Sequence, residues 1–265
     1  MDRVAKDMGI FAQEVTRFGP LDVLPLPDRI IKGLRGLGRT DEEARLRVVA
    51  ARLAQLGNDH DSKHLPTLLR GLGPLEQNML GCMVAGLGTT ALGAAWAAYL
   101  LARYSDWQEK MRIEAAASAG TTAGGTSVAQ QVVQETLRLY PPAPLSARAV
   151  IQRTTLEGFR LWPGQTVIIP VYAIHRHRLL WDRPDSCDPG RFHEDRTYDR
   201  TAFLPFGAGP RLCIAATFAL TEMATILATL VRRFRFTPIG PEPEVSLTAG
   251  TFSLNGLHAL IKRLA

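Results

Sequence analysis

The chain contains 265 residues, of which 46% are hydrophobic and 21% charged. This length and apolar content suffice for one large domain with a sizeable core, and they exclude a disordered or collagen-like protein. The 31 Lys and Arg exceed the 25 Asp and Glu, but the net charge of +6 is spread along the chain. No basic run suits nucleic acid, so an acidic protein partner is the better match to this charge. The three cysteines are too scattered for a disulfide framework, which favours a cytoplasmic setting.

Helices separated by loops are predicted up to about residue 76. Residues 1–18 follow a helical pattern without the features of a signal peptide, and Thr40 with Glu43 opens a second helix as a capping box. The next stretch, Gln77–Ala102, is free of charge and long enough to cross a bilayer. Its internal glycines and threonines, and the absence of a concentration of basic residues beside one end, favour a buried helix of a soluble protein without a membrane anchor.

The second half of the chain predicts helices followed by a small, segregated β part, an α+β fold in which helices dominate. The expected elements are a polar helix ending near Ala117, a small-residue linker over 118–127, a helix over Val128–Leu139, strands over Thr155–Phe159 and Thr166–Val171 joined by a turn at Pro163-Gly164, a helix over Ile214–Phe234, and a hairpin within 245–264 around Asn255-Gly256.

The most informative segment runs from Phe206 to Ala215, where a cysteine stands between a glycine-rich loop and a helix. The positive end of a helix, with its unpaired N–H groups, stabilises a thiolate at Cys213, and Arg211 adds positive charge. Gly207 and Gly209 allow the backbone to approach a flat, bulky ligand. The combination indicates a cysteine that is used chemically.

These residues resemble the haem-binding loop of the cytochrome P450 family, whose pattern is Phe-x-x-Gly-x-Arg-x-Cys-x-Gly. Every position matches except the last, where Ala215 replaces glycine. The resemblance implies haem b as cofactor, Cys213 as the axial ligand of its iron, and Arg211 as the partner of a propionate. Phe206, Gly207, Gly209 and Ala215 would complete the cofactor-binding loop.

Two further motifs agree with the same family. Glu135 and Arg138 match its Glu-x-x-Arg helix, and Arg191 lies in a segment similar to its Pro-x-Arg-Phe motif. The resemblance implies that these three charges form a buried structural network. On spacing alone, a solvated pair on a helix surface remains an alternative for Glu135 and Arg138.

The charge-free helix contains Ala85-Gly86-Leu87-Gly88-Thr89-Thr90, which is similar to the oxygen-activating motif of the family. By this resemblance Thr89 relays protons, while Gly86 and Thr90 complete the catalytic groove. Gly88 occupies the place of the family's acidic residue, which leaves a water-mediated relay, a peroxide-driven reaction or no oxygenation as alternatives. Packing of small residues between helices is the competing interpretation.

The remaining site residues also come from the resemblance. Arg148 would contact the second propionate, with a surface arginine as the alternative, and Ala85, Leu145 and Phe252 would line a substrate pocket. The match begins near residue 20, so the chain is expected to be a single P450-like domain with a shortened N-terminal part. A divergent helical portion over 1–76 would precede a haem-binding core over 77–265, and apolar surface left uncovered would favour self-association.

Two function classes follow from the resemblance. The first is a haem-thiolate monooxygenase that inserts one oxygen atom into an apolar small molecule, with electrons from a ferredoxin and its reductase. The second is a truncated or non-catalytic haem-binding homologue, or a peroxide-dependent variant. A dinucleotide fingerprint at Gly86–Ala91 requires strands where helices are expected, and no nucleophile elbow supports a hydrolase. The histidines fall mostly in polar loops, and His60 with His64 fits a solvated pair better than a metal site.

Overall fold

A computed structural model describes residues 75–117, 127–248 and 251–264 of the chain. The helices predicted before residue 75 and most of the small-residue linker therefore lie outside the described residues. The chain divides into two compact units, residues 1–88 and 89–265. Of the first unit, the structure describes only the beginning of one helix.

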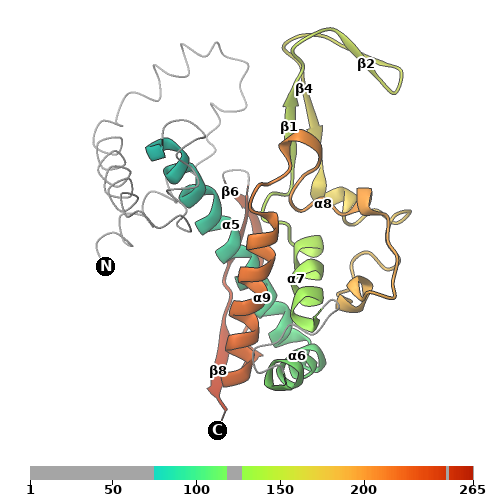
Figure 1. Ribbon diagram of the computed structural model, residues 1–265. Coiled ribbons are helices and arrows are strands. Elements are labelled where there is room, and N and C mark those ends of the chain that lie inside the picture. The colour runs from blue at the N-terminus through green and yellow to red at the C-terminus, as the bar shows by residue number, and fades with distance from the viewer. Residues whose placement is uncertain (1–74, 118–126, 249–250, 265) are drawn as a thin grey trace. The chain divides into compact units, whose positions relative to one another are not determined.

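Helices dominate the described chain, and small antiparallel strand pairs follow them, as the sequence predicts (Figure 1). The longer helices are α5 (Leu75–Arg103), α6 (Ser105–Ala117), α7 (Val128–Leu139) and α9 (Ala216–Arg233). Short helical turns are α8 (Val171–Ile174), η2 (Pro189–Phe192), η3 (Arg200–Ala202) and η4 (Gly209–Arg211). This is the expected α+β class.

Helix α7 has the predicted bounds, and local sequence explains them. The Ser127 side chain accepts a hydrogen bond from the Gln130 N–H, and the Gln130 side chain accepts one from the Ser127 N–H. This reciprocal capping box satisfies two N–H groups that a helix start leaves without partners. Pro141 and Pro142 follow the C-cap residue Tyr140 and prevent the helix from continuing.

The main hydrophobic core lies where α5, α6, α7 and α9 pack together, with strand β5 (Phe234–Pro238) at its edge (Figure 1). Its largest members are Leu101, Met111, Val132, Val133, Leu137, Met223, Leu227, Val231 and Phe236. Ala85–Arg103 of α5 is the one span in the described part of the chain long and apolar enough to cross a membrane. Because Trp96, Ala97 and Leu101 near its C-terminal end are buried in protein, that end serves as a core helix.

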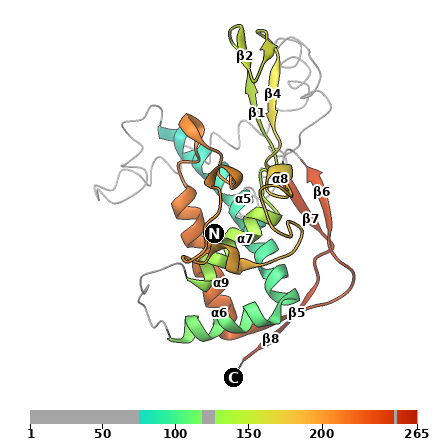
Figure 2. The same ribbon diagram turned by 90° about the vertical axis from the view of Figure 1, so that its right-hand side faces the viewer.

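The β part consists of four antiparallel pairs among the described residues, and two predicted connections are wrong. The strands are β1 (Ser146–Ala149) paired with β4 (Thr166–Ile169), β2 (Thr154–Leu156) with β3 (Phe159–Leu161), β5 with β8 (Ala259–Arg263), and β6 (Glu244–Thr248) with β7 (Thr251–Asn255). Figures 1 and 2 both show the hairpin of β2 and β3 extending away from the helices.

The first correction concerns the turn at Pro163-Gly164, which does not join two paired strands. The hairpin of β2 and β3 turns instead at Glu157 and Gly158, which have positive φ values of 46° and 81°. Positive φ at both central residues fits a two-residue turn whose twist matches the strands. Pro163-Gly164 redirects the chain into β4, which pairs with β1.

The second correction concerns the C-terminal hairpin, which does not turn at Asn255-Gly256. Strand β7 ends at Asn255 and pairs with β6, whereas β8 pairs with the distant β5. Gly256 has a φ of 74°, so it does bend the chain, but it carries the chain between two separate strand pairs. Phe236 of β5 belongs to the helical core, whereas its partner across the strand pair, Ile261 of β8, is exposed.

Candidate functional site

Cys213 lies in a tight loop between η3 and α9. Gly207 and Gly209 adopt positive φ values of 74° and 67°, a conformation that residues with side chains rarely accept. The Gly207 N–H donates to the Leu204 carbonyl at 3.1 Å, and the Cys213 N–H donates to the Phe206 carbonyl at 2.9 Å. The two glycines and these backbone bonds therefore hold the main chain at Cys213.

The surroundings of Cys213 are exposed and apolar. The thiol-bearing residue is itself exposed, and the exposed fractions of Leu212, Ile214 and Phe218 are 56%, 90% and 68%. A gathering of large exposed apolar side chains is informative because each gains free energy, about 25 cal/mol per Å², when a ligand covers it. The geometry suits a broad apolar ligand that bonds to the sulfur.

Helix α9 begins two residues later than the sequence predicts. Its first residue is Ala216 and its N-cap is Ala215, whose methyl side chain makes no capping hydrogen bond. The Ala216 N–H instead donates to the Cys213 carbonyl at 3.3 Å. Cys213 thus precedes the helix by three residues, close to the positive end of its dipole but outside it.

The two arginines predicted to bind propionates differ in their surroundings. Arg211 is exposed in η4, and its guanidinium has no hydrogen-bond or ion-pair partner among the residues with described positions. The Arg148 side chain is also exposed but donates to Ser146 Oγ at 2.7 Å and to the Ala147 carbonyl at 2.9 Å. Within the described part of the chain Arg211 thus has no side-chain partner, whereas Arg148 is held against its own strand.

Glu135 and Arg138 form a fully buried ion pair, so the solvated alternative is wrong. Arg138 Nε and Nη2 donate to the two carboxylate oxygens of Glu135, each at 2.8 Å. Burial raises the pKa of Glu135, and the hydrogen bonds from Arg138 and from the Asp188 N–H counteract that rise. Arg191 Nε lies 3.5 Å from Glu135 Oε1, a charge contact longer than an ordinary hydrogen bond.

The same pair joins helix α7 to the loop that follows α8. Arg138 donates to the carbonyl oxygens of His175, Pro184 and Ser186 at 2.9, 2.6 and 3.0 Å. Each carbonyl in an irregular loop needs a partner when buried, and one guanidinium satisfies three of them. The structure thus brings together Glu135, Arg138 and Arg191, as the family pattern implies.

The predicted catalytic residues Gly86, Thr89 and Thr90 follow one another on α5 and are partly buried. Gly88 is exposed, and a Cβ added there would meet no atom within 4 Å. The described residues around position 88 therefore leave room for an acidic side chain. The predicted pocket residue Ala85 is exposed on the same helix.

Two other predicted pocket residues are brought toward one another through Tyr172. Its N–H donates to the carbonyl of Pro144, next to Leu145, and its ring meets the edge of Phe252 with ring centres 4.9 Å apart. The Phe252 N–H donates to the Pro142 carbonyl at 3.1 Å. Strand β7 and the segment before β1 therefore form one local surface.

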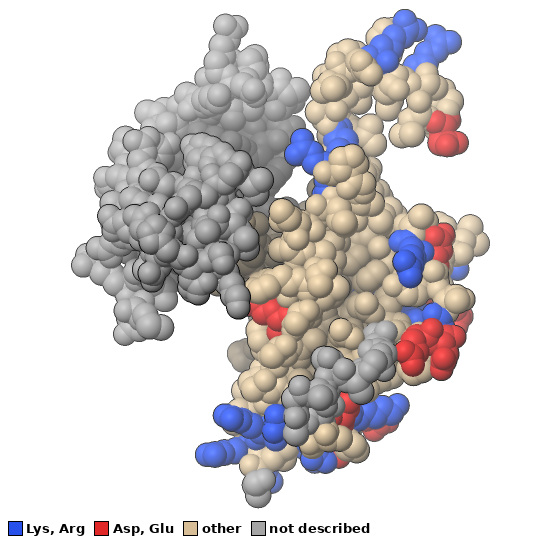
Figure 3. Space-filling view, viewed as in Figure 1, with Lys and Arg blue, Asp and Glu red and all other residues tan. Residues whose placement is uncertain are grey.

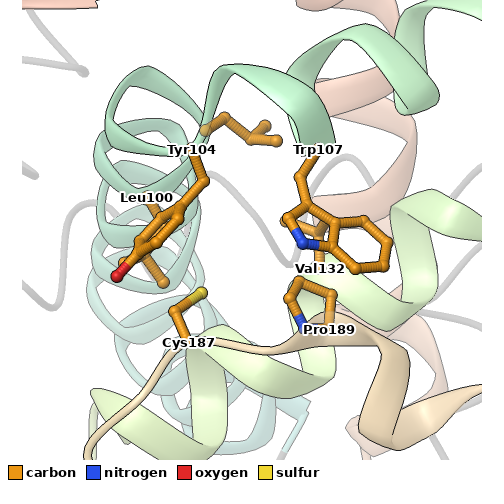
Figure 4. Close-up of a pocket in the computed structure, with 7 residues that line it drawn as sticks. Leu100, Tyr104, Trp107, Val132, Cys187 and Pro189 are labelled. Carbon is orange, nitrogen blue, oxygen red and sulfur yellow. The ribbon is translucent and has the colours of Figure 1, made fainter.

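Cys187 provides a contrast with Cys213. Figure 4 shows its sulfur pointing into a small apolar pocket lined by Leu100, Tyr104, Trp107 and Pro189. Burial raises the pKa of this thiol to about 12, and the charge of Glu135 acts in the same direction. Cys187 is therefore a core residue that stays protonated, whereas Cys213 faces solvent.

His175 is not among the site residues predicted from the sequence, in which most histidines fall in polar loops. Its side chain is fully buried, and its Nδ1 and Nε2 lie 3.1 Å from the Arg138 carbonyl oxygen and 2.8 Å from the Leu204 nitrogen. The one feature of the sequence that could have indicated burial of His175 is its position directly after the apolar run Val171–Ile174. That run indicates burial, but the distant partners could not be identified from it.

Comparisons with known proteins identify the protein family of this chain. The family model for cytochrome P450 matches residues 53–261. The chain is similar to cyclooctatin synthase of Streptomyces melanosporofaciens, with 36% identity over 66% of this chain and 41% of the relative. It is also similar to cytokinin hydroxylase of Arabidopsis thaliana, with 41% identity over 58% of this chain and 31% of the relative.

The structural comparison shows that the fold is shared with solved cytochrome P450 structures. A crystal structure of a cytochrome P450 (CYP102L1) matches with a TM-score of 0.74 and 24% identity, over 88% of this chain and 58% of that one. The haem domain of cytochrome P450DA matches with a TM-score of 0.65 and 25% identity, over 72% and 45%. The chain thus spans less than half the length of the curated relatives named above.

Proposed function

Because the chain belongs to the cytochrome P450 family, we propose that Cys213 is the thiolate ligand of a haem b iron in a monooxygenase. The reaction would insert one oxygen atom from dioxygen into an apolar small molecule. The observation that carries this proposal is the Cys213 loop, which exposes one thiol among exposed apolar side chains. Bound haem would supply the redox chemistry that activates dioxygen.

Cys213 offers a single thiolate donor, which suits a metal ion that is already bound by a cofactor. Within the described residues, no group of three or more His, Cys, Asp or Glu side chains could hold a metal ion. A single thiolate would suffice for the iron of a porphyrin, because the porphyrin nitrogens supply most of its ligands. Leu212, Ile214 and Phe218 would cover apolar porphyrin surface, and Arg211 would neutralise a propionate.

Helix α5 would provide the oxygen side of the reaction. In this proposal Thr89 holds and passes protons through its hydroxyl, with Gly86 and Thr90 shaping the groove beside it. Leu145 and Phe252 would contact the substrate. Because Gly88 carries no acidic side chain, proton delivery would run through water.

The proposal also covers the electron-transfer partner and the cellular compartment. A ferredoxin and its reductase would supply electrons in the cytoplasm, and the apolar surface of the chain would favour self-association. Figure 3 shows Lys and Arg side chains on the hairpin of β2 and β3 and around the ends of α9 and β8. Exposed residues there include Arg153, Arg160, Arg232, Arg235 and Lys262. Such basic surface would attract an acidic partner.

The test uses the full chain loaded with haem, a ferredoxin, its reductase and isotopically labelled dioxygen. A medium-chain fatty acid and a fused-ring hydrocarbon serve as apolar probes. Product carrying one labelled oxygen atom is the expected result. If the haem-loaded protein consumes electrons and produces only peroxide or water with both probes and with a wider set of apolar compounds, the monooxygenase proposal fails.

Gly88 favours a second candidate, a haem-binding homologue that uses peroxide or has no oxygenase activity. The experiment that separates the candidates adds hydrogen peroxide in place of the electron-transfer proteins. Product with peroxide alone supports the peroxide-dependent variant. Introducing a carboxylate with Gly88→Asp or Gly88→Glu is expected to raise the reductant-driven rate, because the carboxyl group would deliver protons and an added Cβ meets no atom of the described residues within 4 Å.

A further inference from the structure

His175 connects two regions of the second unit that are far apart in sequence. It follows α8, and its side chain is completely buried. The backbone N–H of Leu204 donates to His175 Nε2 at 2.8 Å, so this nitrogen must carry the lone pair. The proton therefore resides on Nδ1, which donates to the Arg138 carbonyl oxygen at 3.1 Å.

On one side, His175 is bound to the buried ion pair of α7. The Arg138 guanidinium donates to the His175 carbonyl at 2.9 Å, while the His175 ring donates to the Arg138 carbonyl. The two residues thus bind each other in both directions. Because Arg138 is itself held by both oxygens of Glu135, this side of the imidazole is anchored.

On the other side, His175 holds the start of the loop that carries the thiol. Leu204 donates its N–H to the ring, and its carbonyl accepts from the Gly207 N–H at 3.1 Å. Within the same loop, the Phe206 carbonyl accepts from the Cys213 N–H at 2.9 Å. The ring of Phe203 stacks on the imidazole with ring centres 5.4 Å apart.

We propose that His175 is a positioning residue for Cys213, joining the Glu135–Arg138 ion pair to the thiol loop through the Leu204 N–H. The significance of this link rests on the proposed function of Cys213, but its existence can be tested without haem. Burial lowers the pKa of His175 to about 4, which agrees with a neutral ring at ordinary pH. A neutral ring is required because an imidazolium has no lone pair to accept from Leu204.

Three variants separate this role from simple filling of the core. His175→Phe keeps an aromatic ring and removes both hydrogen bonds. His175→Asn places an amide at the Nδ1 position and keeps the bond to Arg138, whereas His175→Gln reaches the Nε2 position and keeps the acceptor for Leu204. Amide hydrogen exchange of the haem-free chain is followed in two segments, 204–213 and 128–139.

Loss of one buried hydrogen bond is expected to speed exchange of segment 204–213 by about tenfold in His175→Phe and His175→Asn. His175→Gln should exchange at nearly the parent rate there. Segment 128–139 should stay protected in His175→Asn, which retains the bond to α7. Parent-like exchange at 204–213 in both His175→Phe and His175→Asn would overturn the proposal, as would equal loosening of both segments in all three variants.

A second readout addresses the cofactor. When haem is added, the His175→Asn and His175→Phe variants should show a reduced fraction of the thiolate-type ferrous–carbonyl band, and His175→Gln should restore it. If the parent chain takes up no haem, the proposed function fails, while the exchange results still decide the link between His175 and Leu204. If His175 had a merely structural role, its loss would lower the total amount of folded protein. The fraction of the haem-bound protein that shows the thiolate-type band would then stay unchanged.

Discussion

Glu135 and Arg138 are three residues apart on α7 and share two hydrogen bonds of 2.8 Å in a site where neither side chain is exposed. A buried ion pair stabilises a fold only when its remaining hydrogen-bonding groups are also satisfied. Here Arg138 binds three loop carbonyls, and Glu135 accepts from the Asp188 N–H. The pair therefore fixes the loop that carries His175 and Cys187 against α7.

Replacement of Glu135 by Gln tests this relationship. The variant leaves the charge of Arg138 buried without its counterion, so the free energy of unfolding is expected to fall by about 3–5 kcal/mol. Urea denaturation followed by circular dichroism measures the change. Glu109→Gln is the matched control, because Glu109 pairs with Arg112 at the same spacing on the exposed side of α6. An equally large effect of both substitutions would contradict the account.

Gln108 provides an independent test of how the helices are joined to the β part. Its side chain is buried, donates to the carbonyls of Leu101 and Phe236, and accepts from the Phe236 N–H at 2.9 Å. Gln108→Ala removes the partners of these backbone groups and is expected to lower the free energy of unfolding by about 1–3 kcal/mol. Thermal unfolding measures it, with the exposed Gln165→Ala as control. Unchanged stability of the Gln108 variant would show that water or another group replaces the amide.

The pH dependence of stability should report on His175. Its pKa falls to about 4 in the folded chain, through burial first and then through the charges of Arg138 and Arg176, although its bond to the Arg138 carbonyl opposes the fall. The unfolded chain binds a proton at a higher pH, near the ordinary value of about 6.5. Stability from this group is therefore complete above about pH 6.5 and is lost as the pH falls toward 4, by about 3 kcal/mol in total.

Urea midpoints measured between pH 7.5 and 4 test this prediction. The parent chain should lose stability steadily below pH 6.5, and His175→Gln should show a flatter profile, since glutamine does not titrate. Other groups contribute equally to both profiles, so the difference between them isolates His175. Parallel profiles would contradict a buried, neutral imidazole.

The cysteines should differ in reactivity in the haem-free chain. Burial raises the pKa of Cys187 to about 12, so native protein at pH 8 should resist alkylation there, whereas the exposed Cys213 and Cys82 should react. Mass spectrometry of peptides after brief iodoacetamide treatment measures each site. Addition of haem is expected to protect Cys213 and leave Cys82 unchanged. If Cys187 were alkylated as fast as Cys213, Cys187 would not be a buried, protonated thiol.

Features governed by neighbouring residues could be predicted from the sequence. Helix α7 has the expected bounds because Ser127 and Gln130 cap it and Pro141 stops it. The loop of Cys213 was recognisable because its glycines, arginine and cysteine lie within ten residues. The ion pair of Glu135 and Arg138 could be expected from the family pattern, while its spacing alone also fitted a solvated pair.

Features that depend on distant partners could not be predicted. His175 binds groups 37 and 29 residues away, and nothing in its own segment indicates them. Asn255-Gly256 has the composition of a hairpin turn, but β7 pairs with β6 and β8 pairs with β5, a strand far from it in the sequence. Turn composition alone does not decide which strands pair, because strand pairing also depends on packing against neighbours from elsewhere in the chain.

The central claim is that the sulfur of Cys213 binds the iron of haem, and the ferrous–carbonyl absorption spectrum tests it most directly. The parent chain and Cys187→Ser, loaded with haem, reduced and exposed to carbon monoxide, are expected to show the red-shifted band of thiolate ligation. Cys213→Ser should lose that band. A Cys213→Ser spectrum identical to that of the parent, at equal haem content, would contradict the assignment.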